Sequence, residues 1–250
     1  MLNISETLDH IGLYFKMLEA VFSKTERLKV HWINFLKEID KLGVESFGIV
    51  AIISLFMGAV ITLQTSAQMH SSLIPAYLVG FTTRQSTILE FSPTIISLIL
   101  AGKVGSNIAS ELGTMRITEQ IDALEIMGVN SRSYLIFPKI LATMVFNPIL
   151  IIYSIALSIV GGWLVTTTLS TLTVADYMQG IYQDFKPFHV TYSLIKTVVF
   201  AFLITSISAY HGYYTKGGAT AVGVSSTKAV VYGSIAILIS NYILTQLILM

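Results

Sequence analysis

One carboxylate in the sequence lies in an apolar stretch, where it could carry a proton, bind an ion or contact a polar headgroup. Glu90 and the next charged residue, Lys103, are thirteen positions apart, about 20 Å of helix. The hydrocarbon core of a bilayer is about 30 Å thick, so at least one of these charges must be masked. Glu90 could reach the outer surface, pair with Arg84 or face a cavity, and Pro93 predicts a kink or a helix start beside it. A short buried helix with solvated ends is the alternative.

A second group of acids lies in the segment ITEQIDALEIMGVN. Thr118 can cap a helix there and Gly128 can end it, which predicts a helix over about residues 118–128. Acidic and apolar residues occupy opposite faces of it: Glu119, Asp122 and Glu125 on one, and Ile117, Ile121 and Leu124 on the other. This helix is too short to cross a bilayer. It could dock a soluble partner, and a solvated acidic face is the alternative.

Other motifs give no support for enzymatic chemistry. Gly212 and Gly217 have the spacing of a phosphate-binding loop, but Gly218 and Ala219 follow where Lys and Ser or Thr are required. We therefore predict no ATPase site in this chain. The sequence contains no Cys, and its five His do not form pairs at a ligand-like spacing, so no metal site is predicted. We also find no nucleophile with a matching base.

The composition is that of an integral membrane protein. Of 250 residues, 54% are hydrophobic and 12% are charged, and the mean hydropathy is +0.73. The formal net charge of +1 gives no basic excess, so nucleic acid is not an expected partner. The first fifteen residues contain two acids before any base and no long apolar core, so no secretory signal peptide is predicted.

Stretches without charge predict an all-α fold with five transmembrane helices. The expected spans are residues 47–66, 86–108, 138–168, 192–211 and 229–249. After the first of them, TSAQMHSSLIPAY is expected to be a polar loop closed by Pro75. The stretch from Ile140 to Ala175 is long enough for two crossings, but its polar end favours one tilted span.

The basic residues predict the orientation of the spans. With a cytoplasmic N-terminus, three bases remain outside (Arg84, Lys186 and Lys196), and the C-terminus is on the outer, periplasmic side. The inner side receives six bases before Glu45, four between Lys103 and Lys139, and two more: Lys16, Lys24, Arg27, Lys29, Lys37, Lys41, Lys103, Arg116, Arg132, Lys139, Lys216 and Lys228. Six spans would give the same count, so charge does not separate five spans from six.

Residues 1–45 are expected to be a cytoplasmic, interfacial region. Apolar residues recur at steps of three or four with charged residues between them, which predicts one amphipathic helix or two, with Trp32 at headgroup depth. Packing on a cytoplasmic partner is the alternative. Further along, Gly102, Gly105 and Ala109 place small side chains at helical spacing, which favours close helix packing in lipid.

A long central segment and the last loop together show a family resemblance. The segment comprises Glu90 to Pro93 and AGKVGSNIASELGTMRITEQIDALEIMGV, and the loop reads GYYTKGGATAVGVSSTKAVV. These residues resemble the MlaE (YrbE) family of ABC transporter permeases, and residues 46–250 are predicted to form a permease domain of this type. The sequence departs from the family pattern at a few positions: Leu89 for a base, Lys103 and Lys139 for Arg, Ser131 for Pro, and Asn241 for an acid.

The resemblance implies a homodimeric inner-membrane permease of a Gram-negative bacterium, with five spans per subunit. It implies three partners: a cytoplasmic ABC ATPase that binds ATP and Mg, an MCE-domain protein on the outer face, and phospholipid or a related lipid as cargo. A small accessory cytoplasmic subunit is an optional further partner. The short acidic helix would then be a coupling helix. The implied ATPase-coupling residues are Glu111, Gly113, Thr114, Arg116, Glu119, Gln120, Asp122, Glu125 and Gly128.

For the lipid path we expect a cavity between the first, second and last spans of two subunits. The candidate cavity residues are Leu55, Phe56, Ile61, Leu63, Gln64, Glu90, Pro93 and Asn241. The competing hypothesis is a secondary transporter or channel that works without an ATPase and uses Glu90 as an ion site. Such a protein would show inverted internal repeats, and the spans show no convincing match of this kind.

Overall fold

Five helical segments of the computed structural model are long and apolar enough to cross a membrane, which confirms the predicted number. They are His31–Gln68, Tyr77–Ile117, Ser131–Thr166, Pro187–Tyr213 and Ala219–Ile248. The structure describes residues 4–23, 28–69, 75–167 and 172–249. Lys24, Arg27, residue 168 and the middle of the predicted polar loop lie outside these ranges. The described part of the chain contains helices and no strands.

The N-terminal region forms two helices, and the second continues into the first span. α1 (Ile4–Ser23) is separate, whereas α2 (Leu28–Glu38) runs through the π-helical η1 (Ile39–Gly43) and the 3-10 turn η2 (Val44–Ser46) into α3 (Phe47–Gln68). The predicted domain boundary at residue 45 therefore coincides with a change of helix type and not with a break in the chain.

The second span is one long helix that contains two π-helical segments. It consists of α4 (Tyr77–Ser86), η3 (Thr87–Ile95), α5 (Ile96–Leu100), η4 (Ala101–Gly105) and α6 (Ser106–Ile117). Pro93 lies inside η3, so the prediction of a helix start at this residue is wrong. A π-helical turn provides the extra room that a residue without an N–H needs inside a helix.

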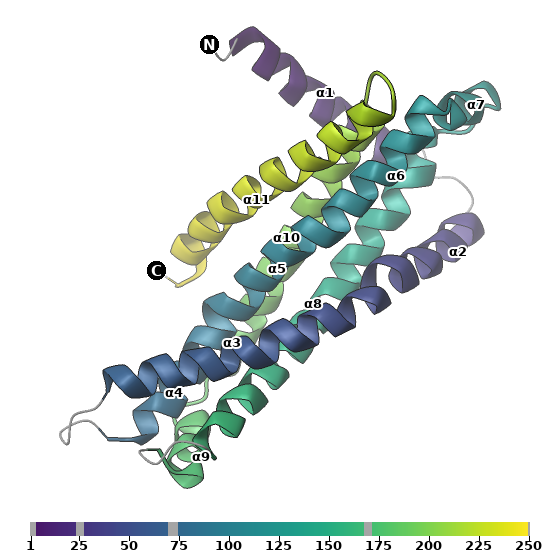
Figure 1. Cartoon of the computed structure of the whole chain (residues 1–250). Helices are drawn as coiled ribbons and strands as arrows, with labels where there is room; N and C mark the ends of the chain where they lie inside the picture. Colours follow the sequence, from purple (N-terminus) through teal and green to yellow (C-terminus); the bar gives the residue numbers. More distant parts are fainter. Residues whose placement is uncertain (1–3, 24–27, 70–74, 168–171, 250) are drawn as a thin grey trace.

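The remaining helices complete the bundle, and Figure 1 shows their arrangement. They are α7 (Gln120–Ile126), α8 (Ser131–Thr166), α9 (Val174–Tyr182), α10 (Pro187–Tyr213) and α11 (Ala219–Leu249). In Figure 1, α1, α7 and the connection between α10 and α11 lie at one end of the bundle, and α9 lies at the other. The third span is thus a single helix, as predicted.

Two details at the α9 end differ from the sequence predictions. α3 continues to Gln68, so the start of the predicted polar loop is helical, and its Thr65 and Ser66 are buried. The sequence reading also missed α9, which crosses α4 where a Cβ on Gly80 would overlap the carbonyl oxygen of Tyr177. Burial against this crossing raises the pKa of Tyr177 to about 12.

Small residues set the contact between α3 and α8. A Cβ on Gly58 would overlap the carbonyl oxygen of Ser158, and one on Gly161 would overlap that of Leu55. Ser54 Oγ donates to Ser154 Oγ at 2.8 Å in the same contact. Close approach of backbones, with a hydroxyl bond across it, is the usual way in which helices associate in lipid.

Of the three predicted packing residues, two contact α10. A Cβ on Gly105 would lie 2.8 Å from Ser208 Oγ, and Ala109 is fully buried beside Gly212. Gly102 differs, because a Cβ there would meet nothing within 4 Å. The prediction of helix packing at Gly102 is therefore not confirmed within one chain, since this position of η4 points away from α10.

These glycines give a matched pair of variants. Gly161→Ala should destabilise the protein by about 1–3 kcal/mol, because the added methyl group forces α3 and α8 apart. Gly102→Ala should leave stability within about 0.5 kcal/mol of the parent, because its Cβ enters open space. Thermal unfolding of both variants in the same detergent measures the difference. Equal midpoints for the two would show that the α3–α8 contact tolerates extra volume.

Candidate functional site

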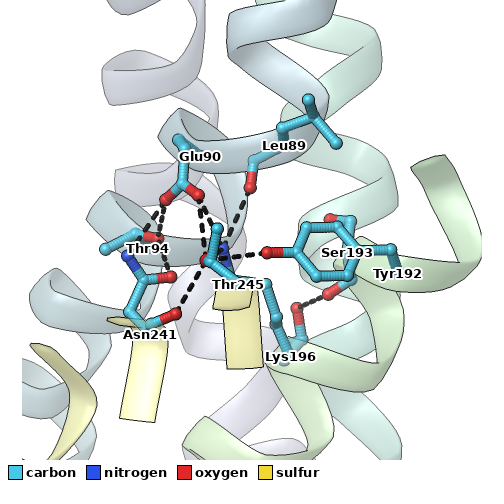
Figure 2. Close-up of polar contacts among 9 residues, drawn as sticks. Leu89, Glu90, Thr94, Tyr192, Ser193, Lys196, Asn241 and Thr245 are labelled. Atoms are coloured by element: carbon cyan, nitrogen blue, oxygen red, sulfur yellow. Dashed lines mark hydrogen bonds and ion pairs between the residues drawn. The ribbon is translucent and has the colours of Figure 1, made fainter. Parts of the chain in front are cut away.

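Glu90 lies in a polar cluster between three spans, shown in Figure 2. Its carboxylate comes from η3, and α10 and α11 close the site around it. Lys196 Nζ forms an ion pair with Glu90 Oε1 at 2.9 Å. Asn241 Nδ2 donates to Glu90 Oε2 at 3.0 Å. The acid in the apolar stretch is therefore neutralised inside the bundle, by a base from α10 and an amide from α11.

The backbone of η3 provides a further acceptor for Lys196. In an α-helix the carbonyl of Leu89 would accept the N–H of residue 93, but Pro93 has none. Lys196 Nζ donates to Leu89 O at 3.1 Å instead. The ring of Tyr192 also lies 4.8 Å from this ammonium group. Pro93 is buried next to the site and helps to shape it by leaving the Leu89 carbonyl free for Lys196.

Hydroxyl groups complete the cluster. Thr94 Oγ1 lies 3.1 Å from Glu90 Oε2 and 3.2 Å from Asn241 Oδ1. Tyr192 donates its hydroxyl to Thr245 Oγ1 at 2.8 Å. Thr245 Oγ1 in turn donates to the carbonyl of Asn241 at 2.7 Å. Each polar atom of the ion pair thus has partners from more than one helix, as buried polar groups require.

Of the alternatives considered for Glu90, pairing with Arg84 does not occur, because Glu90 pairs with Lys196. Arg84 is buried near the α9 end, where its guanidinium donates to the carbonyls of Ile181 at 2.7 Å and Gln183 at 2.9 Å. Ile181 belongs to the last turn of α9 and Gln183 follows the helix directly, at the point where its last backbone acceptors need donors. Arg84 therefore holds the connection between α9 and α10, and it is not available to the carboxylate.

Sequence reasoning missed Lys196 as a functional residue because it was counted as a base outside the membrane. Its side chain is fully buried, at 0% exposure, inside α10. The available signal was a single base within an apolar run, which mirrors the single acid at Glu90. A lone acid and a lone base in apolar spans are each costly, so pairing between them is the expected solution.

The cluster is open on the side of the carboxylate. The Glu90 side chain is 42% exposed, whereas its partner Lys196 is not exposed at all. On α11 the neighbouring Leu238 and Tyr242 are also exposed. A polar group flanked by exposed apolar side chains can contact an amphipathic molecule with both parts of that molecule satisfied.

Within one chain the other predicted cavity residues lie elsewhere. Phe56, Leu63 and Gln64 are exposed on α3, Leu55 is half-buried, and Ile61 is buried. α3 packs mainly on α8 and α4, whereas the Glu90 cluster is closed by α10 and α11. The structure thus brings together Glu90, Pro93 and Asn241 from the predicted set, and it places the α3 residues on another face.

The predicted coupling helix forms, with a different start. α7 begins at Gln120, after Glu119 in a left-handed conformation with φ 59°. Thr118 does not cap it, because its hydroxyl donates to the carbonyl of Thr114 at 2.8 Å and so ends α6. The predicted cap is wrong because the chain reverses at Glu119. Ile121 is buried below α7, in agreement with the predicted apolar strip.

The end of α7 is fixed by a glycine turn, as predicted for Gly128. This residue has φ 78°, which glycine adopts at low cost. Gly128 N–H donates to Glu125 O at 3.0 Å and Val129 N–H to Leu124 O at 3.1 Å, the pattern of a Schellman motif. Next to this turn, Ile126 and Met127 are 87% and 68% exposed. Sequence reasoning missed these two, although the apolar pair before Gly128 was visible.

The predicted coupling residues divide into exposed and structural ones. Thr114, Glu119 and Gln120 are exposed. Arg116 and Asp122 form an ion pair of 2.6 Å that joins α6 to α7. A Cβ on Gly113 would lie 3.2 Å from Thr215 Oγ1, so this position packs beneath the α10–α11 connection. Arg116, Asp122 and Gly113 therefore support the geometry of α7, although the side chains of Arg116 and Asp122 remain partly exposed.

Glu111, in the middle of α6, belongs to a network of four charged side chains. Lys139 Nζ lies 2.8 Å from Glu111 Oε2 and 2.6 Å from Glu38 Oε1. Lys41 Nζ lies 2.9 Å from the same Glu111 oxygen. The network connects α2 and η1 with α6 and α8. Glu111 therefore points toward the N-terminal helices, and its contacts lie within the chain.

Glu125 anchors α7 to the bundle. Its Oε1 accepts hydrogen bonds from the hydroxyls of Tyr213 at 2.7 Å and Ser131 at 2.8 Å. These bonds favour the charged form and hold the pKa of Glu125 below its ordinary value. Glu125 is an exposed residue, but its two hydrogen bonds make the side chain a structural anchor for α7.

We expect this anchor to weaken in acid. A carboxylate with a lowered pKa in the folded state stabilises that state above its unfolded pKa of about 4.3, and the effect is lost as pH falls through the lower folded value. Hydrogen exchange of residues 121–129, corrected for intrinsic rates, should therefore speed up in acid. In Glu125→Gln it should be faster at neutral pH, and the difference from the parent should vanish in acid. A constant difference across pH would contradict this role.

Comparison with known proteins gives consistent matches over most of the chain. A family model described as Permease MlaE matches residues 35–247. A probable ABC transporter permease protein of Rickettsia bellii (strain RML369-C) is 36% identical over 241 residues, which cover 95% of this chain and 91% of the relative. A probable ABC transporter permease protein of Synechocystis sp. (strain ATCC 27184 / PCC 6803 / Kazusa) is 32% identical over 244 residues, with 95% and 92% covered.

A plant relative extends the similarity beyond bacteria. The protein TRIGALACTOSYLDIACYLGLYCEROL 1, chloroplastic, of Arabidopsis thaliana is 31% identical over 223 residues. The match covers 87% of this chain and 62% of that longer protein. The matched family region includes η3, α7 and α11, and so contains both the polar cluster and the short exposed helix.

Proposed function

The chain belongs to the MlaE permease family, and from this premise we propose that it is the membrane subunit of an ABC transporter that moves phospholipid or a related lipid. It is a multi-pass membrane protein with five spanning helices. We place it in the bacterial inner membrane, with a cytoplasmic N-terminus and a periplasmic C-terminus. ATP and Mg would be bound by a separate ATPase subunit and not by this chain.

α7 is the proposed docking element for that ATPase. It lies at the same end of the bundle as α1 and the α10–α11 connection (Figure 1), which carry Lys16 and Lys216, two of the bases assigned to the cytoplasm. Its tip exposes Ile126 and Met127, while Glu125 and the Arg116–Asp122 pair fix its base. A rigid, apolar tip on a charged end suits a complementary pocket on a soluble partner.

The observation that carries the lipid assignment is the half-open polar cluster at Glu90. A lipid headgroup could reach the exposed carboxylate and Asn241, while its acyl chains lie along Leu238 and Tyr242 of α11. The name of the Arabidopsis relative includes that of a lipid, trigalactosyldiacylglycerol, which supports cargo of this class. The ion pair with Lys196 makes Glu90 a poor free proton carrier, so the cluster favours lipid binding over an ion path.

A second copy would complete the proposed cavity. α3 exposes an apolar stripe that includes Ile52, Phe56 and Val60, and α11 exposes apolar residues along most of its length. In a homodimer, α3 residues of one copy could face the Glu90 cluster of the other, which would bring the two halves of the predicted cavity set together. An MCE-domain protein would receive or deliver lipid at the outer end.

Affinity purification through a tag on this chain, followed by mass spectrometry of proteins and lipids, tests the proposal. We expect an ABC ATPase, an MCE-domain protein and phospholipid to co-purify. Recovery of the chain without any nucleotide-binding partner, even after crosslinking, would contradict the proposal and favour the ATPase-independent transporter.

A further inference from the structure

A cavity at the α1 end of the bundle lies far from the Glu90 cluster. It has a volume of about 540 Å³ and is lined from α1, α10 and α11, by residues that include His10, Tyr14, Tyr210, His211, Lys228 and Tyr232. Lys228 is thirteen positions from Asn241 on α11, or about 20 Å along the helix. The two sites are therefore separated by about two thirds of a bilayer core of about 30 Å.

The faces of α1 show what surrounds this cavity. With about 100° per residue, Met17 and Val21 face the bundle and are fully buried. Leu8, Ile11, Phe15 and Phe22 share a second face and are largely exposed. Asp9, Lys16 and Glu19 lie on a third, polar face that is also exposed. A helix with protein, apolar and polar sectors is suited to lie in the membrane surface, beside the bundle.

The cavity is located where the protein-facing and apolar sectors of α1 meet. His10 and Tyr14 border the bundle, while Ile11 belongs to the apolar face, and all three line the cavity. Ile207 lies opposite on α10 and is also part of the lining. The opening therefore faces the region where the headgroups and first methylene groups of lipids would lie.

The polar lining contains one lysine, Lys228, and histidine and tyrosine groups that are held by hydrogen bonds and ring contacts. His10 Nδ1 and the Tyr210 hydroxyl are 2.7 Å apart, and the rings of His211 and Tyr232 stack at 5.2 Å. Tyr14 OH forms a hydrogen bond of 2.8 Å with Ser206. Lys228 makes no ion pair with any residue that the structure describes, and no acid lines the cavity. A cation beside hydroxyl and imidazole groups is complementary to a phosphate.

We propose that this cavity binds one anionic phospholipid of the cytoplasmic leaflet, with the phosphate at Lys228 and an acyl chain along Ile11 and Ile207. Only the leaflet assignment rests on the orientation proposed above. A molecule held between α1, α10 and α11 would tie the interfacial helix to the last two spans. The lipid is thus a ligand separate from the cargo at Glu90.

The test counts lipids on the full chain in nanodiscs of phosphatidylcholine that contain phosphatidylglycerol. After release of the protein from the nanodiscs, native mass spectrometry should show one phosphatidylglycerol retained on the parent. The fraction of chains that retain this lipid should be about fivefold lower in Lys228→Gln. Lys216→Gln is the matched control, because this exposed lysine of the same region does not line the cavity. Its lipid count should equal that of the parent.

A second variant tests the volume of the site. Ile207→Trp fills the cavity and keeps every charge, so it should also lose one lipid. Equal retention of phosphatidylglycerol in the parent and in Lys228→Gln would overturn the proposal. Retention of phosphatidylcholine at the same level as phosphatidylglycerol would overturn it as well. A cavity that retains no lipid and is covered by a second copy would overturn it too. The assay needs no ATPase, so failure of the proposed transporter function would leave its result readable.

Discussion

Replacing both Ile126 and Met127 with Glu should abolish co-purification of the ATPase while the membrane bundle stays folded. Both side chains protrude from the end of α7, so charges there cost little in the free chain. In an interface they would have to be buried without partners. A loss of about 3 kcal/mol is typical for central interface residues, and it corresponds to more than a hundredfold in affinity.

Val174→Glu is the matched control for this experiment. Val174 is a partly exposed apolar residue of α9, at the opposite end of the bundle. It should leave ATPase recovery unchanged. Normal ATPase stoichiometry with the Ile126 and Met127 double variant would show that α7 is not the docking element. Charge reversal at Asp122 is a less direct test, because it also breaks the ion pair with Arg116.

Glu90→Gln should lower the free energy of unfolding by about 1–3 kcal/mol, less than for a fully buried pair because the Glu90 side chain is 42% exposed. The variant leaves the ammonium group of Lys196 fully buried without its anionic partner, and the Leu89 carbonyl, the Thr245 hydroxyl and the Tyr192 ring beside it are neutral. Lys196→Met should cost less, because Glu90 remains partly exposed and keeps Asn241 as a donor. Unfolding measurements in one detergent compare the two.

The double variant Glu90→Gln with Lys196→Met decides whether the pair is coupled. It should be more stable than Glu90→Gln alone, because no uncompensated charge remains in the bundle. If the losses of the two single variants simply add, the contact does not stabilise the protein. Lipid recovery from the same samples separates loss of binding from loss of folding.

The sequence predicted the features that depend on length and composition. Charge-free stretches gave the number of spans because a bilayer requires a minimum apolar length. A short helix before Gly128 could be predicted from the acidic segment, because the end of such a helix depends on the local backbone conformation of the glycine. Asn241 was included as a cavity residue from family resemblance, and the structure places it on Glu90.

Features that depend on tertiary contacts were not predictable in this way. A charge count treats Lys196 and Arg84 as residues outside the membrane, but both are buried by neighbouring helices that supply acceptors. The position of Pro93 does not reveal that a π-helical segment absorbs it. The exposure of Ile126 and Met127 depends on how α7 is held, and spacing alone does not give that.

The four-charge network around Lys139 limits how this protein can move. Lys139 is almost completely buried, and Glu111 is shared between it and Lys41, so α6 cannot slide along α8 without separating Glu111 from a buried ammonium group. α2, α6 and α8 should therefore travel as one rigid block. A displacement of α7 would then move this block as a whole. The second span would bend at its π-helical segments η3 and η4, which lie outside the block. Because Glu90 lies in η3, a displacement at α7 would change the backbone beside the polar cluster.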